Sequence, residues 1–201
     1  MTSLNDTMKL VDAVANDARW MPYWGWHDDH RYNDRQPTYL PALQQVRSEF
    51  EYLIATFIVN DIIGADNRAL QLGLGPTKAS HYALMTMFRR VVTIDEKMCC
   101  IDEGHFHGLD THIASAKAIA AGHGPFDFLF IDAGHKLSDV DQDYFDYRDI
   151  VRPGGIIAIH DACKRPGYEN EVDVWRWLTS FPEGKWTVIG SEVGIAWTRK
   201  G

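Results

Sequence analysis

Two short segments carry acidic and imidazole side chains directly after apolar runs. The first is Asp132-Ala-Gly-His135, which follows the run 126–131, and the second is His160-Asp161, which follows the run 155–159. Carboxylates and imidazoles can bind a metal ion or transfer protons, so four such groups in one crevice would form a candidate catalytic site. The simpler alternative is that both histidines only pack or cap helices.

A glycine-containing turn follows another apolar run. The sequence Gln71-Leu-Gly-Leu-Gly-Pro-Thr-Lys-Ala-Ser80 places Gly73 and Gly75 between a strand-like run and a helical one. Glycines in such a turn let the backbone bend sharply and let a ligand approach the main chain. Lys78 stands where a dinucleotide-binding fingerprint has its third glycine, and no phosphate-loop GK[ST] sequence is present. The turn therefore favours a nucleotide-like ligand without a pyrophosphate, although two glycines can also serve the backbone alone.

Asp95 and Glu96 follow the next strand-like run, at 91–94. Asp95 comes 22 residues after Gly73. In folds of this kind, an acid about 20 residues beyond the glycine turn accepts hydrogen bonds from a ribose. We therefore expect Asp95 to bind a ribose. The alternative is a solvated acid at the end of a strand.

The elements that must position these residues alternate along the chain. Strand-like runs are predicted at 69–72, 91–94, 126–131 and 155–159, and helices at 41–63, 79–88, 111–121, 137–151 and 171–181. This alternation predicts an α/β fold with a doubly wound, mostly parallel sheet and helices on both faces. Ligands bind at the carboxyl ends of such strands, so both polar clusters fall on the ligand side. The runs 186–189 and 193–198 predict an antiparallel C-terminal hairpin, and no strand is placed in 97–108.

Residues 1–40 differ in character from residues 41–201, which form the α/β domain. Aromatic residues stand among proline, glycine and charged residues with neither helical nor strand period, at Trp20, Tyr23, Trp24, Trp26 and Tyr32. A long aromatic loop on a compact domain is often functional, which favours a lid over the substrate. The alternative is that these rings cover the surface of their own domain. Either way we expect residues 1–40 to be a cap on a single domain.

These motifs, in this order, resemble class I S-adenosylmethionine (SAM)-dependent methyltransferases. The segments are GLG, VVTIDE, FDFLFIDAGH and RPGGIIAIHD. The resemblance covers about residues 50–200 and is strongest to macrolide and sugar O-methyltransferases and cephalosporin-hydroxylase-like proteins. It implies a Rossmann-like fold and O-methylation of a small-molecule hydroxyl, such as that of a sugar or polyketide. The implied cofactor-binding residues are Gln71, Gly73, Gly75, Ser80, Asp95, Glu96, Asp132 and Ala133.

Metal-dependent members of the family imply roles for the strand-end residues. By this resemblance Asp132, His160 and Asp161 hold a divalent metal, and His135 is the catalytic base beside Asp132. The chain departs from the family in having Gln71 in place of an acid and His160 in place of an oxygen ligand. An imidazole ligand disfavours magnesium and favours manganese, iron, zinc or no metal. The alternatives for His135 are a helix cap or a contact to the cofactor, which would leave His160 as the next candidate base.

Composition narrows the partners and the location. The formal net charge is −8 and no dense basic cluster occurs, which disfavours nucleic acid and anionic membranes as partners. The sequence has no apolar run of about 18 residues and no signal-peptide pattern, and its three cysteines fit a reducing compartment. We therefore expect a cytoplasmic protein that binds a small-molecule acceptor, with a homo-oligomer compatible with the sequence. The competing functions are a nicotinamide-dependent oxidoreductase of similar architecture and a non-catalytic cofactor-binding domain.

Overall fold

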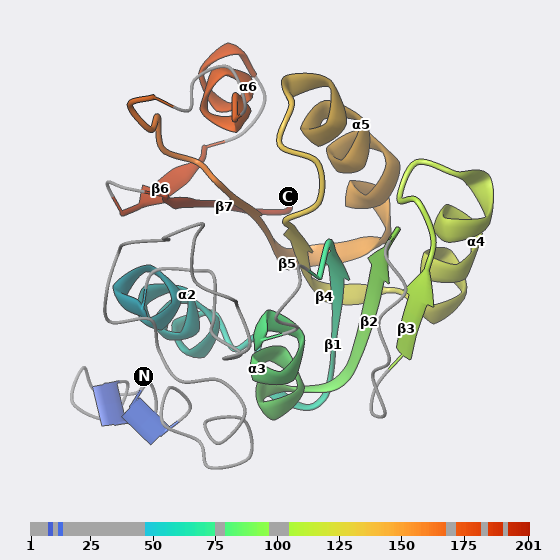
Figure 1. Cartoon of the computed structure of the whole chain (residues 1–201). Helices are drawn as coiled ribbons and strands as arrows, with labels where there is room; N and C mark the ends of the chain where they lie inside the picture. The colour runs from blue at the N-terminus through green and yellow to red at the C-terminus, as the bar shows by residue number, and fades with distance from the viewer. Residues whose placement is uncertain are drawn as a thin grey trace, which may run out of the picture.

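The computed structural model describes residues 8–9, 12–13, 47–74, 79–96, 105–167, 172–181, 185–190 and 193–201. These residues form a seven-stranded sheet of order β3-β2-β1-β4-β5-β7-β6 with helices packed against it (Figure 1). The strands are β1 Gly64–Leu72, β2 Phe88–Asp95, β3 His105–Gly108, β4 Phe126–Ile131, β5 Val151–His160, β6 Thr187–Ile189 and β7 Ile195–Arg199. The helices are α2 Arg47–Val59, α3 Ala79–Met87, α4 Ala114–His123, α5 Leu137–Tyr147 and α6 Val174–Ser180, with a 3-10 turn at Arg148–Ile150.

The sheet is parallel from β3 to β5 and antiparallel at β7 and β6, which confirms the predicted doubly wound sheet and C-terminal hairpin. Strand β1 pairs in parallel with both β2 and β4, so the chain order reverses at β1. Strand β7 runs antiparallel to β5, and β6 pairs antiparallel with β7. Ligands of such sheets bind at the carboxyl ends of the strands next to this reversal.

Helices cover both faces of the sheet, and β4 shows how the sequence encodes this. All six β4 residues are buried, as expected of a parallel strand with helices on both sides. Phe128 and Phe130 face the core formed with α2 and α3, whereas Leu129 and Ile131 face the core formed with α4, α5 and α6. Figure 1 shows α2 and α3 on one side of the sheet and α4 and α5 on the other.

The structure corrects the predicted end of the first helix. The sequence predicted a helix to residue 63, but α2 ends at Val59 and Gly64 opens β1. Asp61 adopts a left-handed conformation with φ 56°. The Ile62 N–H donates to the Phe57 carbonyl at 2.9 Å and the Asp61 N–H to the Ile58 carbonyl at 3.2 Å. These are the two bonds of a Schellman motif, in which an aspartate serves where glycine is more common.

The structure also supplies the third strand that the sequence pattern did not place. Strand β3 is only four residues long, His-Phe-His-Gly, and pairs in parallel with β2 with Asp95 opposite Gly108. Two histidines and a glycine give no apolar signal, so its pairing with β2 defines this strand. No helix in the described part of the chain is both long and apolar enough to cross a bilayer.

Candidate active site

The glycine turn after β1 is built on close contact with the end of β4. Gly73 has φ +84°, and a Cβ at this position would overlap the carbonyl oxygen of Asp132. The Gly73 N–H donates to the Ile94 carbonyl at 2.8 Å, and the Asp132 N–H donates to the Leu72 carbonyl at 2.8 Å. Backbone packing therefore requires glycine at position 73 independently of any ligand. Gly75, the second predicted glycine, lies outside the described residues.

Gln71 joins the end of β1 to the start of α3. Its side chain is fully buried, and Nε2 donates to the Gly73 carbonyl at 2.7 Å and to Ser80 Oγ at 2.6 Å. The other amide atom, Oε1, is buried and has no hydrogen-bond partner among the described residues. Buried polar atoms are normally satisfied, so this acceptor beside the glycine turn could take a hydrogen bond from a ligand.

Asp95, the predicted ribose acid, lies at the end of β2 and faces the same turn. Its Oδ2 accepts a hydrogen bond from the Leu74 N–H at 2.6 Å. A charge-assisted bond to the backbone fixes the carboxylate next to the Gly73 turn. Glu96, one residue further along, is exposed.

The four titratable groups predicted to converge do lie together at the ends of β4 and β5. These strands pair in parallel with Ile131 opposite Ile159, so the residues after them are neighbours. His160 Nδ1 is 2.9 Å from Asp132 Oδ1 and 3.5 Å from Asp161 Oδ2. His135 Nε2 is 3.4 Å from Asp161 Oδ2.

Asp161 is the centre of this cluster. Its side chain is 3% exposed and its backbone is left-handed with φ 59°, a conformation rarely seen outside glycine. Besides the two histidines, Asp161 contacts the Arg165 guanidinium. Sequence reasoning missed Arg165, because its position four residues after Asp161 carries no motif.

His135 is held by a second segment that the sequence did not single out. The Asp173 N–H donates to the His135 carbonyl at 3.0 Å, and Asp173 Oδ1 accepts from the Leu137 N–H at 2.5 Å. Desolvation lowers the pKa of His135 below its ordinary value, with His160 and Arg165 acting in the same direction and Asp132 opposing them. The imidazole is therefore neutral at pH 7, as a general base requires.

A metal ion could be held by part of this cluster. Asp132, His135 and Asp161 each offer one ligand atom, and these atoms all lie within 4.8 Å of one another. His160, the histidine expected from the sequence, instead directs Nδ1 at Asp132, while its buried Nε2 has no hydrogen-bond partner in the described part of the chain. Two carboxylates and one imidazole suit a transition ion better than magnesium. The Arg165 guanidinium on Asp161 would compete with such a cation.

The aromatic segment predicted to form a lid lies outside the described residues. This holds for Trp20, Tyr23, Trp24 and Trp26. The lid, and the division into a cap at 1–40 and a domain at 41–201, therefore stay predictions.

Comparison with known proteins finds a family model that matches part of the chain and solved structures with a similar fold. Residues 78–162 match the family model described as a methyltransferase domain. No curated protein sequence matches the chain. The solved structures that resemble it include several methyltransferases, and the resemblance predicted from the motifs is thus confirmed for the domain and the fold.

Three of these structures illustrate the similarity. The MycE methyltransferase of the mycinamycin biosynthetic pathway, in complex with Mg and SAH (S-adenosylhomocysteine), is 21% identical with a TM-score of 0.57 over 75% of this chain and 48% of that chain. The O-methyltransferase TomG from Streptomyces achromogenes, in complex with SAM, is 16% identical with a TM-score of 0.56 over 100% of this chain and 92% of that chain. An O-methyltransferase from Bacillus cereus, in complex with SAH, is 16% identical with a TM-score of 0.52 over 100% of this chain and 93% of that chain. The chain thus spans about half the length of MycE.

Proposed function

We propose that this chain, which carries a methyltransferase domain on a class I methyltransferase fold, transfers a methyl group from SAM to a hydroxyl of a small molecule. The observation that carries the proposal is the set of contacts at the carboxyl ends of the parallel strands. There the strand ends bring together the Gly73 turn, Asp95, Asp132, His135 and Asp161. A ribose acid beside a glycine turn and a neutral imidazole beside two carboxylates are what such a reaction needs.

The cofactor half of the proposal rests on Gln71, Gly73 and Asp95. The orphaned Oε1 of Gln71 is an acceptor suited to the ammonium group of the methionine part. The Asp95 carboxylate, fixed by the Leu74 N–H, would accept from the ribose hydroxyls. The glutamine would then replace the acid that the family usually has at position 71, with an amide oxygen in place of a carboxylate oxygen.

The acceptor half rests on His135. A nitrogen that is bound to a metal cannot accept a proton, so His135 serves either as ligand or as base. We assign it as the base because its side chain is 46% exposed, whereas that of Asp161 is 3% exposed and that of His160 is 7% exposed. It is thus the group of the cluster most accessible to an acceptor. Its neutral form would take the hydroxyl proton as the oxygen attacks the methyl carbon.

The carboxylates of Asp132 and Asp161 are the groups that would hold a divalent ion in this arrangement. Such an ion, when bound, would lower the pKa of the acceptor hydroxyl and orient it. Asp132 also accepts from His160, and Asp161 fixes the position of His135. These contacts orient the base with or without an ion.

The test is ligand binding by calorimetry with SAM, SAH and NAD, each with and without divalent metals. We expect SAM and SAH to bind and NAD not to bind. Asp95→Ala should weaken SAH binding by about 1–3 kcal/mol, because charged acceptor hydrogen bonds are lost. Asp66→Ala is the matched control. Asp66 is an exposed acid that pairs with Arg89 near the start of β1, at the opposite end of the strand from the Gly73 turn. Tight NAD binding would instead favour the oxidoreductase, and unchanged affinity in Asp95→Ala would remove Asp95 from the site.

A further inference from the structure

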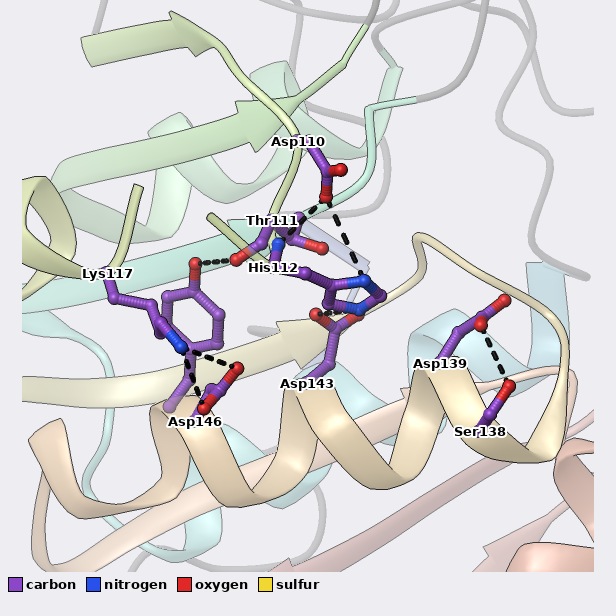
Figure 2. Close-up of polar contacts among 9 residues, drawn as sticks. Asp110, Thr111, His112, Lys117, Ser138, Asp139, Asp143 and Asp146 are labelled. Atoms are coloured by element: carbon purple, nitrogen blue, oxygen red, sulfur yellow. Dashed lines mark hydrogen bonds and ion pairs between the residues drawn. The ribbon is translucent and has the colours of Figure 1, made fainter. Parts of the chain in front are cut away.

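A buried carboxylate lies behind the segment that follows β3, outside the site described above. Asp143 on α5 is 0% exposed. Its Oδ1 lies 3.3 Å from His112 Nε2, and the Thr111 side chain lies close enough to lower the pKa of the carboxyl group. Figure 2 shows the His112 ring directed from the post-β3 segment toward the Asp143 carboxylate. The two groups therefore lie within ion-pair distance, and their attraction depends on an ionised Asp143 carboxylate.

The same segment has a second attachment to α5. The Tyr147 hydroxyl donates to the Thr111 carbonyl at 2.5 Å. Burial raises the pKa of Tyr147, so this hydroxyl stays protonated and remains a donor. Within the segment, the His112 N–H donates to Asp110 Oδ1 at 2.9 Å. Residues 109–113 are thus fixed to α5 at two points, one turn of helix apart.

These residues begin next to the predicted ribose acid. In the β2–β3 pairing Asp95 is opposite Gly108, the last residue of β3. Segment 109–113 therefore leaves the sheet at the same edge as the Gly73 turn and directly beside Asp95. Any displacement of the segment would therefore change the surroundings of the Asp95 carboxylate.

We propose that Asp143 is a positioning residue that holds segment 109–113, through His112, as a wall of the cofactor site beside Asp95. This inference rests on the cofactor half of the proposed function. Asp143 does not touch the cofactor itself. It acts through the placement of His112 and of the backbone around it.

The surroundings of Asp143 make this contact sensitive to pH. Burial raises the pKa of Asp143 to about 6, with His112 and Thr111 opposing the shift. The charged and titratable groups around it are Asp139, Asp146 and Tyr147 on α5, Asp110 and His112 in the segment, and Lys117 on α4, which pairs with Asp146. As the pH falls through about 6, the carboxylate gains a proton and its attraction to His112 is lost.

The experiment measures SAH affinity by calorimetry from pH 5 to pH 8 for the wild type, Asp143→Asn and Asp146→Asn. We expect wild-type affinity to fall by about 3- to 10-fold below pH 6. Asp143→Asn should bind with the weaker affinity throughout and lose the pH dependence. Asp146→Asn is the matched control, because it removes an acid of the same helix that pairs with Lys117. The Asp146 charge helps to raise the pKa of Asp143, so this variant should keep the pH dependence but shift it to lower pH. A pH dependence retained in Asp143→Asn would overturn the proposal.

A second variant, His112→Gln, guards against the case in which Asp143→Asn does not fold. A second readout, hydrogen exchange without ligand, does not depend on cofactor binding. His112→Gln changes a side chain that is 28% exposed and should reproduce the loss of pH dependence. Hydrogen exchange of the amides of 109–113, measured without ligand at pH 7.5, should be faster in Asp143→Asn and His112→Gln than in Asp146→Asn. If the wild type binds neither SAM nor SAH, the proposed function fails while faster exchange still supports the positioning contact. Unchanged exchange in both variants would overturn the positioning contact itself.

Discussion

The molecule contains two clusters in which aspartate meets histidine, and they differ in the charges around them. In the candidate active site, Asp161 is surrounded by cationic or potentially cationic groups, His135, His160 and Arg165. Behind the post-β3 segment, Asp143 faces one imidazole, while Asp139 and Asp146 on its own helix are acidic. Side chains from several segments of the chain offset the negative charge of Asp161. The negative charge of Asp143 is offset only by the segment after β3, among the described residues.

Desolvation acts on both clusters with opposite signs for acid and base, in full on the buried Asp143 and in part on the half-exposed His135. Desolvation disfavours the charged form, so it lowers the pKa of His135 and raises that of Asp143. The His135 imidazole is therefore neutral at pH 7, whereas the pKa of Asp143 is raised to about 6. This difference fits the roles that we propose, proton transfer for the first cluster and positioning of the backbone for the second.

The largest expected effect separates the two histidines. His135→Ala should lower the turnover number by about 10²–10⁴ with SAH affinity nearly intact, because a general base is lost. His112→Gln, the matched change in the other cluster, should leave turnover at saturating SAM within about threefold and change SAH affinity instead. The measurement is steady-state transfer to an alcohol acceptor together with calorimetry. Unchanged turnover in His135→Ala would make His160 the candidate base.

The next effect concerns stability and pH. The pKa of Asp143 is about 6 in the folded protein against a reference value of 3.8, so between these values the native state binds more protons than the unfolded state. The free energy of unfolding should therefore decrease as the pH rises from about 4 to about 6. Asp143→Asn lacks this term and should gain stability over the wild type across that window. The gain should be on the order of 3 kcal/mol at most, since a shift of about two pKa units is worth about 1.4 kcal/mol per unit.

Urea denaturation at pH 4 and pH 6.5 measures this difference. Asp146→Asn is the control, because Asp146 pairs with Lys117 and is less buried. Its stability should keep a dependence on pH that is shifted to lower pH, because the Asp146 charge helps to raise the pKa of Asp143. A parallel pH dependence in the wild type and Asp143→Asn would show that the carboxylate does not titrate in this range.

The positions of the site residues followed from the sequence because they follow strongly apolar strands. The β4 run 126–131 is buried throughout, and its end fixes Asp132 beside the end of β5. What the sequence did not reveal depends on tertiary contact. Strand β3 has no apolar pattern and forms by pairing with β2. The His112–Asp143 contact joins residues on separate elements, and only the packing of α5 brings them together.

The smallest expected effect tests how strongly Arg165 compensates the active-site cluster. Its guanidinium contacts Asp161, which is one of the three residues able to surround a cation. A fixed positive charge at that carboxylate weakens the binding of a metal, because the two cations compete for the same oxygen atoms. Arg165→Gln should therefore tighten the binding of Mn²⁺ by about 3- to 10-fold, which corresponds to roughly 0.7–1.4 kcal/mol. Arg148→Gln is the control, since Arg148 pairs with Asp149 away from the site. Calorimetry with Mn²⁺ alone decides the question. Equal affinity in all three proteins would show that Arg165 does not compete, and binding that is lost in Asp132→Asn would confirm that the ion sits in the cluster.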